Sequence, residues 1–138
     1  MTVYLDTSVV LRVLLGQPRK ISCWGRWDKA WSSRLWHAEA LRTADRLRLT
    51  GEIDDPQVVR LRTDIDLVDQ TLHVVTLTDA IWLRAEESFP TVVGTLDGIH
   101  LATALRLRHH SAIDLFLTHD QQLGLAARSL GFTVEGVD

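Results

Sequence analysis

The sequence feature that most constrains the fold is a change of pattern at Asp6, close to the start of the chain. Residues 3–5 form a short apolar run, and apolar residues then recur at helical spacing from Val9 to Leu14. Asp6 therefore lies at a turn between a strand and a helix, and open α/β sheets bind ligands beyond the carboxyl ends of their strands. Capping of the helix by Asp6 or Thr7 is the structural alternative, because both side chains accept hydrogen bonds from free N–H groups.

The alternation of strand and helix continues along the whole chain. The expected strands are residues 3–5, 73–77, 115–117 and 132–134, and the expected later helices span about 33–49, 55–69, 79–87, from 95 onward and 120–131. Strands that alternate with helices predict a parallel sheet covered on both faces. A chain of 138 residues with 46% hydrophobic content has the size of one domain.

Composition and charge narrow the setting of the protein. Cys23 is the only cysteine, which excludes an internal disulfide and a cysteine zinc cage and fits a reducing compartment. No basic and apolar leader pattern and no membrane-length apolar run is present, so we expect a soluble, cytoplasmic protein. Residues 12–48 carry nine Lys or Arg against three acids, and residues 49–100 carry ten acids against three arginines. This pattern fits a nucleic-acid backbone that meets a metal pocket, with solvated helix faces as the simpler alternative.

Three tryptophans, Trp24, Trp27 and Trp31, recur at helical spacing after a polar connection. Such an aromatic stripe most often packs in the core, and a partner-binding surface is the alternative. Glu39 lies at the edge of the apolar stripe of the next helix, where a carboxylate must pair or serve a site. An ion pair with Arg42 is the structural alternative for this residue.

Two further acids, Asp97 and Asp120, lie at the starts of helices, as Asp6 does. Asp120 follows a predicted strand and therefore lies on the same side of a parallel sheet as Asp6, and Asp97 shares a helix face with apolar residues. Asp79 also follows a strand, but a role in capping explains it. His100, one turn after Asp97, is expected to pack or to hydrogen-bond, with metal ligation as the less common alternative.

Four carboxylates that converge at one edge of a sheet repel one another and raise each other's pKa values. A divalent cation removes this conflict, and Mg²⁺ and Mn²⁺ prefer oxygen ligands. Such an ion lowers the pKa of a bound water and stabilises charge on a phosphodiester oxygen. The acids therefore predict metal-assisted hydrolysis of phosphodiesters.

Four segments of the chain, in order, resemble the motif blocks of PIN-domain ribonucleases, above all the VapC toxins of toxin–antitoxin pairs. These segments are YLDTSVVLR, SSRLWHAEALR, TLDGIHLATALRL and LFLTHDQQLGLAARSLG. The resemblance implies a PIN-like three-layer α/β/α fold, with a central parallel sheet of about four to five strands, in a single domain over residues 1–138. It also implies an endoribonuclease that forms a homodimer and is inhibited by a VapB-type antitoxin whose tail covers the site.

The resemblance assigns roles to particular residues. The acids implied to hold Mg²⁺ or Mn²⁺ are Asp6, Glu39, Asp97 and Asp120. Glu39 would bind directly or through water and align the attacking hydroxide, and Asp120 would act mainly through its field. Ser8 and Thr118 fall on small polar positions that flank such sites. The arginines expected to hold RNA phosphates are Arg12, Arg19, Arg26 and Arg34.

The chain departs from the family pattern at two positions, and two alternative functions stay open. Gly98 stands where many relatives have alanine and His119 where they often carry an aromatic or polar residue, but neither change removes a ligand. A nuclease for structured DNA and a non-cleaving module that binds RNA or protein are two alternatives. An aspartyl phosphotransferase generally needs a second Asp where this chain has Ser8. The partner-binding alternative for the tryptophans would place them at an antitoxin groove or a dimer surface.

Overall fold

Five parallel strands form the central sheet, in the spatial order β3-β2-β1-β4-β5. The strands are β1 (Thr2–Leu5), β2 (Lys29–Ser33), β3 (His73–Val75), β4 (Leu115–Leu117) and β5 (Val134–Glu135). This computed structural model describes all 138 residues. Because every neighbouring pair of strands is parallel, all carboxyl ends meet at one edge of the sheet, and β1 lies at its centre.

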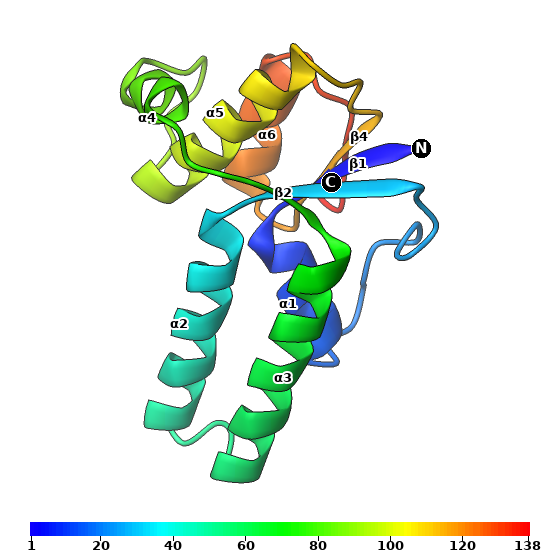
Figure 1. Cartoon of the computed structure of the whole chain (residues 1–138), viewed down its shortest axis with the longest axis vertical. Coiled ribbons are helices and arrows are strands. Elements are labelled where there is room, and N and C mark those ends of the chain that lie inside the picture. Colours follow the sequence, from blue (N-terminus) through cyan, green and yellow to red (C-terminus); the bar gives the residue numbers. More distant parts are fainter.

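Six helices cover the two faces of the sheet (Figure 1). They are α1 (Thr7–Leu14), α2 (Leu35–Leu49), α3 (Asp55–Thr71), α4 (Asp79–Glu86), α5 (Thr95–Arg108) and α6 (Gln121–Ser129). Helices α1, α2 and α3 contact one another on one face, whereas α4, α5 and α6 lie on the other, so the predicted three-layer parallel fold is confirmed. In Figure 1, α2 and α3 run side by side and extend well beyond the sheet. None of the six helices has the length and apolar character that crossing a membrane requires.

Two hydrophobic cores lie on opposite sides of β1. Val3 and Leu5 belong to the core beneath α1, α2 and α3, and Tyr4 belongs to the core beneath α5 and α6. All three side chains are fully buried, which explains why β1 is a continuous apolar run and does not alternate with polar residues. Tyr4 stacks on Phe116 of β4, with ring centroids 5.0 Å apart. Burial of each such side chain stabilises the fold by roughly 1.5–3 kcal/mol.

The strand β2 was not predicted, and the helical spacing of the tryptophans does not correspond to a helix. Trp24 and Trp27 lie in a turn segment and pack edge to face with centroids 5.2 Å apart, and Trp31 lies within β2. The sequence of β2, KAWSS, contains no β-branched residue, and the strand forms because it pairs with both β1 and β3. All three tryptophans are partly buried and pack against the two cores, as the core interpretation predicts, and the partner-binding alternative stays a prediction.

Most helix boundaries agree with the sequence pattern because their caps are encoded locally. Asp54 accepts a hydrogen bond from the backbone N–H of Gln57, and the Gln57 side chain accepts one from the N–H of Asp54, which completes a capping box for α3. Thr78 caps α4 by accepting a hydrogen bond from the N–H of Ile81, so the capping role expected of Asp79 is wrong and Asp79 lies in the first turn instead. The last strand begins two residues later and ends one residue later than expected, and Phe132 precedes it and packs in the second core.

Candidate functional site

Asp6 lies directly after β1, at the centre of the sheet edge where the carboxyl ends meet. Its backbone N–H donates a hydrogen bond of 3.0 Å to the carbonyl of Leu117 in β4, and 5% of the residue is exposed. Its carboxylate Oδ2 accepts hydrogen bonds from Ser8 Oγ (2.5 Å) and Thr118 Oγ1 (2.9 Å). Asp6 occupies the N-cap position of α1, but no N–H of the helix bonds to its side chain, so the carboxylate is not used for capping.

The two hydroxyls that hold Asp6 also connect it to the turn after β4. Ser8 Oγ accepts a hydrogen bond of 3.0 Å from the backbone N–H of His119, and Thr118 Oγ1 accepts one of 3.0 Å from the N–H of Asp120. Each hydroxyl therefore donates to the carboxylate and accepts from the backbone. This arrangement fixes one oxygen of Asp6 without using a cation.

Glu39 reaches the same edge from α2 and is held by a buried histidine. Its Oε1 accepts hydrogen bonds from Nε2 of His100 (2.6 Å) and from Oγ1 of Thr7 (2.7 Å). His100 is fully buried, and its Nδ1 lies 2.9 Å from the hydroxyl of Tyr4. Because a carboxylate only accepts hydrogen bonds, Nε2 of His100 carries a proton. The expected hydrogen-bonding role of His100 is confirmed.

The predicted alternative partner of Glu39 is engaged elsewhere. Nη1 of Arg42 lies 3.2 Å from a carboxylate oxygen of Asp45, one turn along α2, and no ion pair joins Arg42 to Glu39. Burial lowers the pKa of His100, but the hydrogen bond to Glu39 and the nearby carboxylates outweigh it, so that the net pKa is raised. The protonated form of His100 is therefore favoured at the edge that the acids occupy.

Asp97 lies in the first turn of α5 and is half-buried. Burial raises the pKa of its carboxyl group to about 6, and the charges of Asp120 and then Asp6 add to the rise. Asp120 is exposed and caps α6 by accepting a hydrogen bond of 2.9 Å from the N–H of Leu123. All four predicted acids thus come to the same edge: Asp6 and Glu39 meet at His100, and the charge of Asp120 acts on the carboxyl group of Asp97.

The donor set at this edge fits a hard divalent cation. Ligand atoms of Asp6, Glu39 and His100 all lie within 4.8 Å of one another. Asp6 Oδ1 and Glu39 Oε2 accept no hydrogen bond within the chain, and Nε2 of His100, which donates to Glu39 Oε1, lies 3.5 Å from Asp6 Oδ1. Free carboxylate oxygens without thiolates suit Mg²⁺ or Mn²⁺ better than Zn²⁺.

Two hollows adjoin the acids. A groove of about 680 Å³ runs along α2 from Glu39 and is lined by both Arg42 and Arg46. A cleft of about 310 Å³ lies beside Asp120 and is lined by Arg12 and, again, Arg46. Of the four arginines named for binding phosphates, only Arg12 lines either hollow, and Arg46 comes from the same basic stretch of residues 12–48 without having been named.

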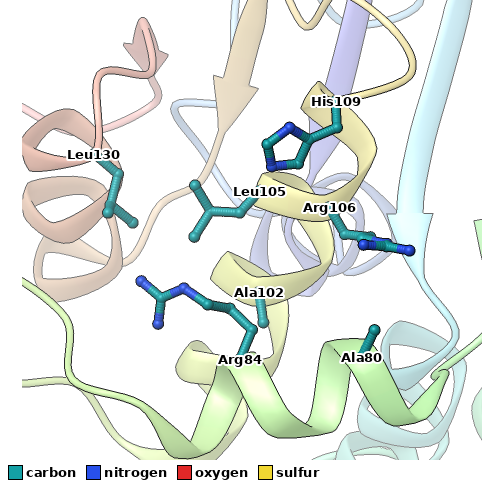
Figure 2. A pocket seen from close by; sticks show the side chains of 7 residues that line it. All are labelled: Ala80, Arg84, Ala102, Leu105, Arg106, His109 and Leu130. Carbon is teal, nitrogen blue, oxygen red and sulfur yellow. The ribbon is translucent and has the colours of Figure 1, made fainter.

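A third hollow lies away from the acids, between α4, α5 and the end of α6. Figure 2 shows Leu105 of α5 and Leu130 on opposite sides of this space of about 250 Å³, with Arg84 of α4 and His109 at its margins. Its lining includes none of the four acids. A hollow with basic side chains is therefore not by itself evidence of the candidate site. The two hollows assigned to the site are distinguished by their proximity to the acids.

The sequence reasoning missed the residues that orient Glu39. Thr7 directly follows Asp6 and could have been considered as a donor, but it was weighed only as a cap. Tyr4 sits in the buried strand, where a hydroxyl needs a partner, and this is the signal that could have identified it. The pairing of His100 with Glu39 has no local signal, because the two residues are 61 positions apart.

Known proteins resemble this chain along nearly its full length. The sequence pattern of the PIN domain matches residues 3–128. Ribonuclease VapC47 from Mycobacterium tuberculosis (strain CDC 1551 / Oshkosh) is 28% identical over 137 residues, which cover 94% of this chain and 93% of that protein. The structure of FitAcB from Neisseria gonorrhoeae superposes with a TM-score of 0.73 at 17% identity and covers 97% of this chain and 96% of that chain. VapBC-1 from nontypeable Haemophilus influenzae gives a TM-score of 0.62 at 18% identity, covering 98% and 97%.

Proposed function

This chain belongs to the PIN-domain family, and from that premise we propose that it is a metal-dependent endoribonuclease of the VapC type, built as one domain over residues 1–138. The observation that carries the proposal is the meeting of Asp6 and Glu39 around His100, beside an Asp97 whose pKa is raised to about 6. Acids held this close disfavour one another's charge unless a cation joins them. The related VapC47 is named a ribonuclease, which supports RNA as the substrate.

The residues proposed to hold Mg²⁺ or Mn²⁺ are Asp6, Glu39, Asp97 and Asp120. Asp6 would use Oδ1 and Glu39 would use Oε2, since the other oxygen of each carboxylate already accepts hydrogen bonds. When bound, the ion would lower the pKa of a water molecule and stabilise charge on the phosphodiester. Ser8 and Thr118 would support the site by fixing the orientation of Asp6.

The other residues of the edge have positioning roles in this proposal. Glu39, held by Thr7 and His100, would orient the attacking water against the phosphodiester. Asp120 is exposed and already caps α6, so its contribution would come mainly from its field. Arg12 and Arg46 line the cleft beside Asp120 and would bind backbone phosphates of the RNA.

We also propose that the enzyme acts in the cytoplasm as a homodimer and is inhibited by a cognate VapB-type antitoxin. The solved relatives include VapBC-1, and the structure of VapBC2 from Rickettsia felis is bound to a DNA fragment from their promoter. The groove along α2 begins at Glu39 and combines Arg42 and Arg46 with Leu35 and Leu96. A segment with both acidic and apolar side chains fits such a lining and would cover Glu39.

The test is cleavage of total cellular RNA by the purified protein with Mg²⁺ or Mn²⁺ and with chelator. Discrete fragments that require the metal and vanish in Asp97→Asn support the proposal, and Asp79→Asn is the matched control, because Asp79 is an exposed acid outside the site. DNA of the same sequence as the cleaved RNA separates a ribonuclease from a DNA nuclease. If wild type and Asp97→Asn behave alike while both are folded, the proposal fails and a non-cleaving binding module takes its place.

A further inference from the structure

Two buried polar atoms without partners lie on residues that line the cleft beside Asp120. The walls of this cleft come from α1, α2 and the turn after β4, and they include Arg12 and His119. Arg12 Nε and His119 Nε2 are both buried and have no hydrogen-bond partner within the chain. Buried polar atoms are nearly always paired in folded proteins, so Arg12 needs one acceptor and His119 one partner from outside the chain, and the cleft that both residues line is the nearest space for them.

The partner that His119 lacks can be identified from its other ring nitrogen. Nδ1 of His119 lies 2.8 Å from the carbonyl oxygen of Gly136, and a carbonyl can only accept, so Nδ1 carries the proton. In the neutral imidazole Nε2 is then an acceptor and requires a donor. Gly136 has φ +102°, and a Cβ there would collide with the carbonyl of Thr118, so the position of the Gly136 carbonyl depends on this glycine.

A ribonucleotide supplies both missing groups. Its phosphate oxygens accept hydrogen bonds from the Arg12 guanidinium, and its ribose 2′-hydroxyl donates to an acceptor. Nη1 of Arg12 is held only by a bond of 3.3 Å to the carbonyl of Pro18, which leaves the guanidinium able to turn toward a phosphate. Arg46 adds a second cation from α2, across the cleft.

The cleft also lies where a nucleotide next to the reacting group would lie. Ser8 lines it and donates to Asp6 Oδ2, and the backbone N–H of His119 donates to Ser8. One hydroxyl therefore separates the cleft from the carboxylate that we assign to the metal. A nucleotide in the cleft would be the immediate neighbour of the scissile phosphodiester.

We propose that this cleft binds the ribose-phosphate unit beside the scissile phosphodiester, and that Nε2 of His119 accepts a hydrogen bond from its 2′-hydroxyl. His119 is then a specificity-determining residue that favours RNA over DNA. This inference rests on the proposed ribonuclease function and adds to it the residue that recognises the sugar. Donor groups of a base are the competing partners for Nε2, and the experiment below separates them from the ribose.

The test replaces single 2′-hydroxyls of a cleaved RNA by hydrogen, one position at a time. For wild type, one substitution beside the cleavage site should lower kcat/KM roughly fivefold to tenfold, the loss expected for one hydrogen bond. The variant His119→Asn keeps an N–H for the Gly136 carbonyl, but its shorter side chain places no acceptor at the position of Nε2. It should lose a similar factor on all-ribose RNA and then be indifferent to the same substitution. An equal loss in wild type and variant, or no sensitive position in wild type, would overturn the proposal.

A binding measurement distinguishes failure of this inference from failure of the proposed function. Fluorescein-labelled RNA and DNA of the same mixed sequence are titrated with wild type and His119→Asn in chelator, so that no cleavage is required. Wild type should prefer RNA, and His119→Asn should lose that preference while its thermal melting remains that of a folded protein. Arg12→Ala should weaken both ligands equally, because it removes a phosphate contact. A His119-dependent preference supports the inference even if no RNA is cut, and an unchanged preference refutes it even if RNA is cut.

Discussion

Two junctions of this molecule have the same local pattern, a strand followed by an acid and a helix, but occupy very different places. Asp6 follows β1 at the centre of the sheet and is 5% exposed, whereas Asp79 begins α4 after the edge strand β3 and is exposed. The side chain of Asp6 is held by two hydroxyls, while Thr78 and not Asp79 caps the helix at the other junction. The local pattern therefore identifies a junction, and the position of its strand in the sheet decides what surrounds the acid.

The sheet order explains why the neighbours gather at Asp6. From β1 the chain proceeds to β2 and β3 on one side and then returns to place β4 on the other side of β1. Adjacent crossovers that leave in opposite directions open a crevice at the carboxyl edge, which is the usual ligand site of open α/β sheets. Asp6 and Thr118 lie at this point, and α2 brings Glu39 to it from the side of β2. Strand β3 has only one neighbouring strand, so no comparable crevice forms at Asp79.

The largest expected contrast between the junctions is catalytic. Asp6→Asn should reduce metal-dependent RNA cleavage by roughly 10²–10³-fold or more, the usual loss when a group that stabilises the transition state is removed. Asp79→Asn should leave the rate within about twofold, since surface changes away from such features have small effects. Initial rates on one RNA substrate at saturating Mn²⁺ measure both. Equal cleavage rates for Asp6→Asn and Asp79→Asn would show that the two junctions do not differ in function and that Asp6 is not a catalytic residue.

The second contrast concerns the buried histidine that Glu39 has and Asp79 lacks. His100→Gln can still donate to Glu39 but loses the contact of His100 with the Tyr4 hydroxyl, and His100→Ala loses both. Groups that orient metal ligands change affinity by about 10–100-fold when removed. The Mn²⁺ concentration for half-maximal cleavage should therefore rise by that factor in His100→Ala and by less in His100→Gln. An unchanged Mn²⁺ requirement in both folded variants would show that His100 has only a packing role.

The sequence predicted the junctions better than the contacts between them. β1 and β4 were predicted because continuous apolar runs are typical of buried parallel strands, and α3 because its capping box is local. β2 was missed because Ser32 and Ser33 look like a polar helix start. In the fold both serines are buried, and Ser32 Oγ donates a hydrogen bond of 2.8 Å to the carbonyl of Leu5. Sheet pairing, which no single segment encodes, determines this strand.

Only those residues of the candidate site whose type is restricted by the chemistry could be predicted from the sequence. Four acids could be selected because a cation needs oxygen ligands, and the structure brings those acids to one edge. The contact between His100 and Glu39 depends on how α5 and α2 meet across the sheet, and Arg46 enters the cleft because α2 lies beside α1. Such contacts arise from packing between elements and leave no pattern in either segment alone.

A third contrast is in stability: the charge of Asp97, at the central edge, should destabilise the fold, whereas the charge of Asp79, at the exposed junction, should stabilise it. The folded pKa of Asp97, about 6, lies above that of an unfolded Asp, so its charge destabilises the metal-free fold above pH 6. This cost is relieved as the pH falls through about 6 toward 4. Allowing for solvent screening of a half-exposed group, Asp97→Asn should gain about 1 kcal/mol at pH 7.5, or roughly 3 °C in Tm, and nothing near pH 4.

Asp79→Asn supplies the opposing control for that measurement. Asp79 lies in the first turn of α4, where a negative charge interacts favourably with the helix dipole by about 0.3–1 kcal/mol. The variant should therefore melt slightly below wild type at pH 7.5 in chelator. Addition of Mn²⁺ should raise the Tm of wild type more than that of Asp97→Asn. A metal-free Asp97→Asn that melts below wild type at pH 7.5 would contradict the crowding of acids at the central edge.

The smallest expected effect tests whether the two junctions are independent. Gly98, beside Asp97 in α5, packs against the segment after α4, and a Cβ there would lie 3.3 Å from Cε2 of Phe89. Gly98→Ala gains helix propensity of roughly 0.5–1 kcal/mol, and a small shift of the Phe89 ring offsets part of it. Stability should change by less than about 1 kcal/mol and cleavage by less than about twofold. If cleavage instead falls tenfold in a folded protein, the packing of α4 on α5 controls Asp97. The junction of β3 and α4 would then affect the site through the packing of α4, although its own acid, Asp79, lies outside the site.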